Sequence, residues 1–336
     1  MYYLVYYLLS FISLLAPSKI KPYLFSIIWF LFIGFRDGIG VDFYGTINVI
    51  ERQIIDFNDI SNSFTGYNLF DAEIVYKIIG TFLDFNDINI NYSLTAIALI
   101  EAIFIFLLIK KTENKNLFIF FIIASFSLHY PMNAIRQGFC LIGLIFANNY
   151  FENRKSTSST FFYIFSLLSH YASLPIVFLS RLKINLKTFI VASVIATLIL
   201  NYLNFNTLLL RYSIDSTDAF TFKGYGLKLY FFSFLFIVFN YFVMKKNILT
   251  SENLYIILFL IITVNFNPFF RLFYFYIYYI LFSSIFKLDY KNLNGSQKFL
   301  TVISPIFFFL FEWQEIMRFK PCFGCGDWLP YKSLIF

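Results

Sequence analysis

Charged residues are scarce in this chain of 336 residues, because Asp, Glu, Lys and Arg together make up only 13% of it. A soluble domain carries roughly 25% charged residues, since its surface must face water. Hydrophobic residues reach 59%, and the mean hydropathy is +0.71. Lipid is the simpler solvent for such a composition, which therefore predicts an all-α integral membrane protein.

Cysteine and histidine are also rare, with three and two residues. Cys140 lies in an apolar run, whereas Cys322 and Cys325 form one CxxC sequence near the C-terminus. A zinc site usually needs a second pair of ligands, and His129 and His170 are distant in the sequence. We therefore expect no metal site, and we interpret the CxxC sequence as a pair of thiols or one local disulfide.

Nucleotide-binding motifs are missing as well, because the sequence contains neither a Walker A nor a GxGxxG motif. An ATP-driven or nucleotide-sugar mechanism thus has no recognisable binding site on the chain. The formal net charge is +7, but the positive residues lie between apolar segments, where membrane topology explains them better than nucleic acid does. We expect no cofactor and no nucleic-acid partner.

Apolar stretches, in contrast, follow one another with little between them. They predict a polytopic helical membrane protein with about ten transmembrane helices, in a single integral membrane domain over residues 1–336. The first stretch lacks the basic start and the small-residue cleavage site of a secretory signal peptide, so we expect none. The predicted spans are 2–17, 22–36, 91–109, 116–131, 135–151, 187–203, 227–244, 254–267, 271–286 and 298–312.

The stretch 160–180 is ambiguous, because Ser169, His170 and Ser173 interrupt its apolar run and Pro175 follows. A single crossing here would put the lysines and arginines of the later short loops outside, against the positive-inside rule. A re-entrant hairpin that turns near His170 returns them to the cytoplasm. Irregular backbone at that depth is tolerated where protein or water covers it. We therefore predict the hairpin, with both termini on the extracytoplasmic side.

Three polar segments then lie on the extracytoplasmic side: residues 37–90, residues 204–226 and the tail 313–336. Long loops on one side of a helical bundle are a natural place for a binding site. The cytoplasmic loops are too short to hold a nucleotide-binding domain. The sequence therefore predicts that any site for a ligand faces the exterior.

An arginine follows directly on the second predicted span, in the run FRDGIGVDFYG, which contains Arg36, Gly38, Gly40 and Asp42. The planar guanidinium fork of arginine suits phosphate groups, and nearby glycines let backbone N–H groups approach an anion. The alternative is an interfacial arginine that snorkels beside a local Asp and precedes a glycine turn.

Arg136 and Arg271 each begin an apolar helix just after a proline. A charge within a span costs about 2.5–3.5 kcal/mol on insertion scales, and a cation at a helix N-terminus also opposes the helix dipole. An anionic ligand would offset both effects, and so would pairing with an acid of an outer loop. Together with Arg36, and with Arg211 as a fourth, these arginines have the chemistry to hold a diphosphate.

Two further residues stand out within apolar segments. His170, at the break in LLSHYASLP, suits a general base near neutral pH. Alternatively, it ties the hairpin together through hydrogen bonds. Glu101 lies inside a predicted span, where it either pairs with a polar group of the bundle or couples protons in a transporter.

The same residues carry a resemblance to a known family. In chain order, they are the RxGxGxD run at Arg36, Gly38, Gly40 and Asp42, the MxxxRQG helix start at Met132, Arg136, Gln137 and Gly138, the SHYASL break around His170, and the LPYK run at Pro330 and Tyr331. This ordered set resembles the EpsG family, which belongs with the Wzy-type polymerases of polysaccharide export. The family often has Thr and Tyr in the first run, where this chain has Val41 and Phe43.

The resemblance implies a polymerase that joins oligosaccharide repeat units carried on polyprenyl diphosphate, without a metal or a nucleotide sugar. The growing chain moves from its carrier to the non-reducing end of the next lipid-linked unit, and the free lipid diphosphate leaves. His170 or Asp42 would take the proton of the acceptor hydroxyl. The residues expected to bind the diphosphate or the substrate are Arg36, Arg136, Arg271, Arg211 and Gln137.

The same resemblance places the protein in the cytoplasmic membrane of a bacterium, with its site facing the periplasm or the exterior. The expected partners are the lipid-linked oligosaccharide, the bilayer, and a flippase and chain-length regulator of the same pathway. Two other readings stay open. One is a flippase or transporter of lipid-linked oligosaccharide, and the other is a different membrane glycosyltransferase, a ligase or an acyltransferase.

Overall fold

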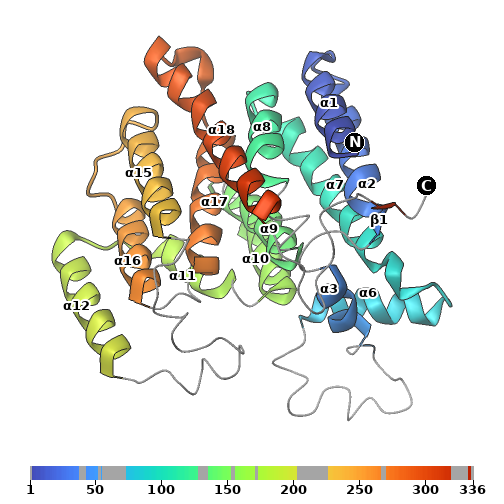
Figure 1. Ribbon diagram of the computed structural model, residues 1–336, viewed down its shortest axis with the longest axis horizontal. Coiled ribbons are helices and arrows are strands. Elements are labelled where there is room, and N and C mark those ends of the chain that lie inside the picture. Colours follow the sequence, from blue (N-terminus) through green and yellow to red (C-terminus); the bar gives the residue numbers. More distant parts are fainter. Residues whose placement is uncertain are drawn as a thin grey trace. The chain divides into compact units, whose positions relative to one another are not determined.

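Figure 1 shows the fold, which is described from a computed structural model of the chain. The structure describes residues 2–37, 43–51, 54, 73–127, 135–152, 156–170, 173–202, 226–265, 270–318 and 332–333. The predicted site residues Asp42 and Arg211 lie outside these ranges, as do both cysteines of the CxxC sequence and Tyr331 of the LPYK run.

The described chain is helical apart from one short strand pair, so the prediction of an all-α protein is confirmed. The helices are α1 (Tyr2–Leu15), α2 (Lys21–Gly34), α3 (Phe43–Glu51), α6 (Ile74–Phe85), α7 (Ser93–Lys111), α8 (Lys115–Phe121), α9 (Ile135–Glu152), α10 (Ser156–Ser169), α11 (Ser173–Arg181), α12 (Leu186–Tyr202), α15 (Gly226–Phe242), α16 (Ser251–Asn265), α17 (Phe270–Phe286) and α18 (Gly295–Arg318). A π-helical stretch (Ile122–Phe126) extends α8, and 3-10 turns cover Ile90–Tyr92 and Tyr290–Asn292.

Each predicted span coincides with one of these helices, or with α8 and its π-helical extension. Within the described residues, one helix is long and apolar enough to cross a membrane by itself. It runs over Ile90–Lys111, with 22 residues and a hydropathy of 2.4. The remaining apolar helices have 10–17 residues. The helix positions are therefore confirmed, whereas the crossing of a membrane by about ten helices stays a prediction.

The chain forms two compact units, and the single integral membrane domain over residues 1–336 stays a prediction. Unit 1 comprises Met1–Leu174, Ile285–Lys287 and Phe308–Phe336. Unit 2 comprises Pro175–Ser284 and Leu288–Phe307. The first unit contains Arg36, Arg136 and His170, and the second contains Arg271. The candidate residues are thus divided between two units.

Two antiparallel helix pairs organise unit 1 (Figure 1). In the pair of α2 and α7, the Thr95 hydroxyl donates to the Gly34 carbonyl at 2.6 Å near one end. In the pair of α9 and α10, the Ser159 hydroxyl donates to the Ala147 carbonyl at 2.8 Å. Gly143 lets α10 approach α9 closely, since a Cβ at this position would collide with side-chain atoms of α10.

The segment 37–90, in which the sequence analysis predicted no helix, contains α3 and α6. Their apolar residues recur at helical spacing, as with Tyr76, Ile79 and Leu83 of α6. These residues pack with the starts of α7 and α9 in one buried cluster. The cluster consists of Phe43, Ile47, Ile50, Tyr76, Ile79, Leu83, Leu94, Ile97, Ile135 and Phe139. This packing places the beginning of α6 beside the beginning of α9.

A two-residue antiparallel strand pair joins β1 (Arg36–Asp37) to β2 (Lys332–Ser333) within unit 1. Arg36 is paired with Ser333 and Asp37 with Lys332. The RxGxGxD run therefore adjoins the last residue of the LPYK run, although almost the whole chain separates them. No local pattern in the sequence predicts this pairing.

In unit 2, buried amides and aromatic rings link the helices. The Asn240 side chain of α15 donates to the Asn253 side chain of α16 at 2.9 Å. Phe232 packs edge-on against Tyr274 of α17. The tyrosines that follow Arg271 in α17 are buried, so this part of the helix is core and not an exposed aromatic face.

Candidate functional site

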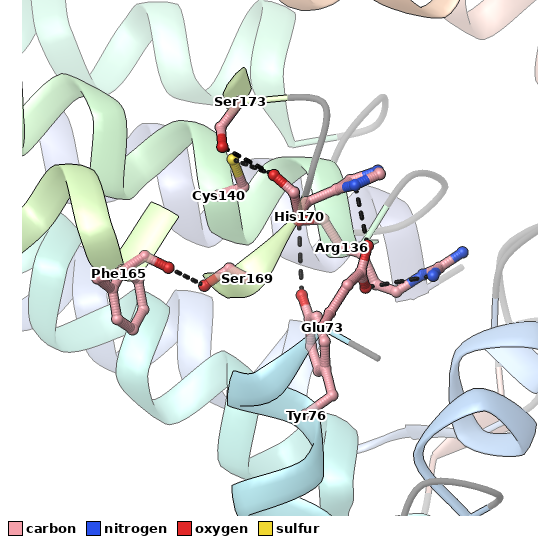
Figure 2. A network of polar contacts seen from close by, with 8 residues as sticks. All are labelled: Glu73, Tyr76, Arg136, Cys140, Phe165, Ser169, His170 and Ser173. Atoms are coloured by element: carbon pink, nitrogen blue, oxygen red, sulfur yellow. Dashed lines mark hydrogen bonds and ion pairs between the residues drawn. The ribbon is translucent and has the colours of Figure 1, made fainter. Parts of the chain in front are cut away.

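Three helix ends of unit 1 meet at one carboxylate (Figure 2). Glu73 stands immediately before α6, Arg136 is the second residue of α9, and His170 follows the last residue of α10. Because 63 residues separate Glu73 from Arg136 in the sequence, only the tertiary fold brings these side chains together. We call Glu73, Arg136 and His170 the charged cluster.

Glu73 contacts both other members of the cluster through different oxygens. Its Oε1 lies 2.9 Å from His170 Nδ1, and its Oε2 lies 3.2 Å from Arg136 Nη1. The Glu73 side chain is only 5% exposed. A carboxylate so far removed from water needs charged or hydrogen-bonding partners, and the cluster provides two of them.

The backbone of His170 is held from both sides of the helix break. Its N–H donates to the Ser166 carbonyl at 3.0 Å, within the last turn of α10. Its carbonyl accepts from the Ser173 hydroxyl at 2.8 Å and from the Cys140 thiol at 3.9 Å. The break that the sequence predicted near His170 is therefore confirmed and well bonded. Whether residues 160–180 form a re-entrant hairpin in a bilayer stays a prediction.

Arg136 is the most open member of the charged cluster, with a side chain that is 27% exposed. The sequence left two partners open for it, an anionic ligand and an outer-loop acid. The structure provides an acid, Glu73, from the segment 37–90, whose extracytoplasmic position stays a prediction. This contact offsets the unfavourable interaction of a cation with the N-terminal end of a helix dipole, and the remaining exposure leaves the guanidinium accessible to a ligand.

Tyr76 of α6 lies next to the charged cluster and contacts the backbone of Arg136. Its hydroxyl lies 3.5 Å from the Arg136 carbonyl, at the start of α9 (Figure 2). Burial raises the pKa of the Tyr76 phenol well above its usual value, and the Glu73 carboxylate raises this pKa further. The phenol therefore stays neutral and keeps its proton for donation.

Arg36 lies in different surroundings, because it is only 1% exposed. Its charge acts on the carboxyl of Glu101, in the middle of α7. The Trp29 Nε1–H of α2 donates to Glu101 Oε2 at 3.3 Å. The Trp29 contact agrees with the alternative in which Glu101 meets a polar group of the bundle. The buried Arg36 guanidinium interacts electrostatically with the same carboxyl.

The other predicted site residues are only partly placed. Gln137 follows Arg136 in α9 and is half-buried. Arg271 is the second residue of α17, in unit 2, and its side chain lies outside the described part of the structure. Asp42 and Arg211 fall outside it altogether. The described residues contain no group of three or more His, Cys, Asp or Glu side chains placed to hold a metal ion.

Glu73 is the residue that sequence reasoning missed. Its only signal was its position, since it is an acid directly in front of the helical pattern of α6. Acids are common before helices, so this position alone does not distinguish a site residue from a helix-stabilising one.

Apolar helices and a charged cluster at helix ends define the class of this molecule, a membrane protein with a polar site. The chain belongs to the EpsG family, whose sequence model matches residues 19–333, nearly the whole chain. Members of this family are Wzy-type polysaccharide polymerases, which implies a membrane setting and a lipid-linked oligosaccharide substrate. Comparison with curated proteins and with solved structures gives no match.

Proposed function

We propose that the protein polymerises polyprenyl-diphosphate-linked oligosaccharide repeat units into a surface polysaccharide, at the extracytoplasmic face of the cytoplasmic membrane. The family supports a polymerase. The observation that carries the chemistry is the contact of His170 Nδ1 with the Glu73 carboxylate, 2.9 Å away, beside the Arg136 guanidinium. A base and a fixed cation side by side suit glycosyl transfer from a diphosphate.

In the proposed reaction, a hydroxyl oxygen of the acceptor sugar attacks the anomeric carbon of the donor chain. The new glycosidic C–O bond forms while the bond from that carbon to the diphosphate oxygen breaks. His170 takes the hydroxyl proton through Nε2, since Nδ1 faces Glu73. The bonding pair leaves with the lipid diphosphate. Asp42 is the second candidate for the base, carried over from the family resemblance.

Negative charge grows on the leaving diphosphate in the transition state, so a guanidinium fixed nearby lowers the barrier. Arg136 is suited to this role by its partial exposure, and Gln137 beside it is suited to donate a hydrogen bond. Arg271 and Arg211 are carried over from the sequence as further candidates to bind the diphosphate. Arg36 is almost fully buried, which favours an action on the site through the order of α2 and α7 over direct contact with substrate.

The proposed topology places the charged cluster outside, where a flippase would deliver the lipid-linked units and a chain-length regulator would act on the product. A reporter fused after Lys246 checks this orientation. Activity of a reporter that works only in the cytoplasm is the expected result, and an extracytoplasmic signal would overturn the topology.

Glycan analysis in a strain without the gene tests the function. We expect lipid-linked single repeat units to accumulate on the outer side, and long chains to return with the wild-type gene. Arg136→Ala and Arg271→Ala should remain in the membrane but give no long chains. Lys110→Ala, which removes an exposed cation at the end of α7, serves as the control and should restore them.

Three outcomes of the same experiment contradict parts of the proposal. Unchanged chain-length ladders with Arg136→Ala would remove this arginine from the site. Lipid-linked units trapped on the cytoplasmic side would indicate a flippase. Single finished chains that fail to reach their final acceptor would indicate a ligase.

A further inference from the structure

We propose that Glu73 is a positioning residue of this site, which holds the His170 imidazole as its Nδ1–H tautomer and holds the Arg136 guanidinium beside it. The inference about geometry stands on the contacts of the charged cluster. Its consequence for the reaction rests on the proposed function.

The tautomer follows from the chemistry of the two groups in contact. An ionised carboxylate only accepts hydrogen bonds. His170 Nδ1 lies 2.9 Å from Glu73 Oε1, and a lone pair on Nδ1 at that distance would face the negative carboxylate oxygen. The carboxylate therefore favours the ring form that carries its proton on Nδ1. In the neutral ring, Nε2 then carries the lone pair, which is the form that a general base requires.

The orientation of the ring has two determinants. Hydrogen bonds of the His170 backbone to Ser166 and Ser173 fix where the side chain begins. The Glu73 contact then fixes the rotation of the side chain, since the ring must keep Nδ1 toward Oε1. Without Glu73, the backbone would stay in place while the ring could turn away from its working position.

The position of Glu73 also favours this role over a purely local one. Glu73 occupies the N-cap position of α6, with φ −67° and ψ 102°, yet its side chain makes no capping hydrogen bond to that helix. A capping side chain normally satisfies one of the free N–H groups there. The carboxylate of Glu73 instead reaches two other helix ends.

A structural tether between three helix ends is the competing explanation, and the tautomer distinguishes the two. The chain has only two histidines, His129 and His170. In a His129→Gln background, ¹⁵N labelling of histidine therefore reports on the His170 ring alone. In detergent-solubilised protein we expect the Nδ1–H tautomer. Glu73→Ala should redistribute the tautomers, whereas Asp84→Asn, which changes an exposed acid at the other end of α6, should not.

The spectrum is decisive even if Glu73→Ala does not fold. A wild-type ring protonated on Nε2 with a bare Nδ1 would overturn the proposal, because Nδ1 would then have no proton to donate to Glu73. An Nδ1–H tautomer that survives Glu73→Ala in folded protein would overturn it as well. Neither measurement depends on the reaction that the protein catalyses.

A double-mutant cycle tests the consequence for the reaction. Glu73→Gln keeps the shape of the side chain without its charge, and should lower kcat by roughly 10²-fold with little change in KM. If Glu73 acts through His170, Glu73→Gln should have a much smaller effect in a His170→Ala protein, where only its contact with Arg136 remains. An equal loss in both backgrounds would make Glu73 a structural tether.

The two proposals fail in different ways. Full activity of His170→Ala would remove the base from the proposed function, while the Nδ1–H tautomer would still establish the contact with Glu73. An Nε2–H tautomer in the wild-type protein, together with an inactive His170→Ala protein, would be compatible with the proposed function. It would rule out the positioning role of Glu73.

Discussion

Arg36 and Arg136 look alike in the sequence, where each stands at one end of an apolar segment, but the structure gives them different surroundings. Arg36 is 1% exposed and interacts electrostatically with Glu101 of α7. The Arg136 side chain is 27% exposed and contacts Glu73 among helix ends. An enclosed cation orders the protein around it, whereas a partly open cation can also meet a ligand. The same residue type thus serves two purposes in one unit.

The largest effect should come from removing the enclosed cation. Arg36→Ala removes a long side chain that is only 1% exposed, and truncating a large buried side chain to alanine costs about 2–5 kcal/mol. We expect a lower yield of folded protein and a lower unfolding midpoint in detergent. If Arg36→Ala kept its stability and lost only activity, the structural role assigned to Arg36 would be wrong.

A compensating change sharpens this test. In the double variant Arg36→Met, Glu101→Gln, no buried ionisable group is left at these two positions, and the amide oxygen of Gln can still accept from Trp29 Nε1. Replacement of buried ionisable groups by neutral residues of similar volume is often close to neutral, so most of the lost stability should return. A double variant as unstable as Arg36→Ala alone would show that neither the lost volume nor an uncompensated buried group is the cause.

Arg136→Ala should have the reverse profile, with folding retained and transfer lost. Glu73 keeps its contact with His170 in this variant, so the carboxylate is not left alone. Loss of one fixed group that stabilises transition-state charge costs about 10²–10³-fold in kcat. Arg136→Lys keeps the charge without the planar fork and should recover part of the rate. Transfer of lipid-linked units in isolated membranes, with the unfolding midpoint measured in parallel, checks both expectations.

The fold was largely predictable because its signal is local. The apolar runs that became α2, α7 and α9 are visible as continuous stretches of sequence, and the polar break before α11 marked His170. The segment 37–90 was harder, since the apolar residues of α6 alternate with polar ones at helical spacing. Transmembrane segments are recognised by a high mean hydropathy over a long stretch. A short amphipathic helix such as α6 is therefore missed.

The site was less predictable, because its contacts connect distant parts of the chain. Arg136 and His170 were found as unusual residues in apolar segments, but no local pattern connects either of them to Glu73. The direction of a side chain was equally hidden. Snorkelling predicts that an interfacial arginine extends toward water, whereas the charge of Arg36 acts on a carboxyl within α7.

Close packing beneath the charged cluster gives the next prediction. A Cβ at Gly143 of α9 would collide with Ser166 Oγ and lie 3.0 Å from Phe165 Cδ1. Ser166 belongs to the last turn of α10, which ends beside His170. Gly143→Ala should therefore cost about 1–3 kcal/mol through overpacking, and also lower transfer activity by displacing the base.

Gly45→Ala in α3 is the matched control, since a Cβ there meets nothing within 4 Å. Alanine is the better helix former by roughly 0.5–1 kcal/mol, so the control should keep or slightly raise the unfolding midpoint. Equal effects of the two substitutions would show that helix propensity, and not the α9–α10 contact, decides the result.

The smallest loss of stability should come from the contact between α2 and α7 next to Arg36, which we call the seam. The Thr95 hydroxyl of α7 donates at 2.6 Å to the Gly34 carbonyl, in the last turn of α2 and two residues before Arg36. The final carbonyls of a helix have no partner within it, so this bond satisfies an acceptor and links the two helices. Thr95→Val keeps the shape of the side chain and should cost about 0.5–1.5 kcal/mol.

The same substitution at Thr46 separates the hydrogen bond from the change of residue type. Thr46 in α3 is buried at 1% exposure, and its hydroxyl has no hydrogen-bond partner among the described residues. Valine removes a buried polar group there, so Thr46→Val should be neutral or stabilising. A lower unfolding midpoint for Thr95→Val than for Thr46→Val is the expected result. Equal midpoints would mean that the bond to Gly34 contributes nothing to the seam, and that the enclosure of Arg36 depends on its charge and packing alone.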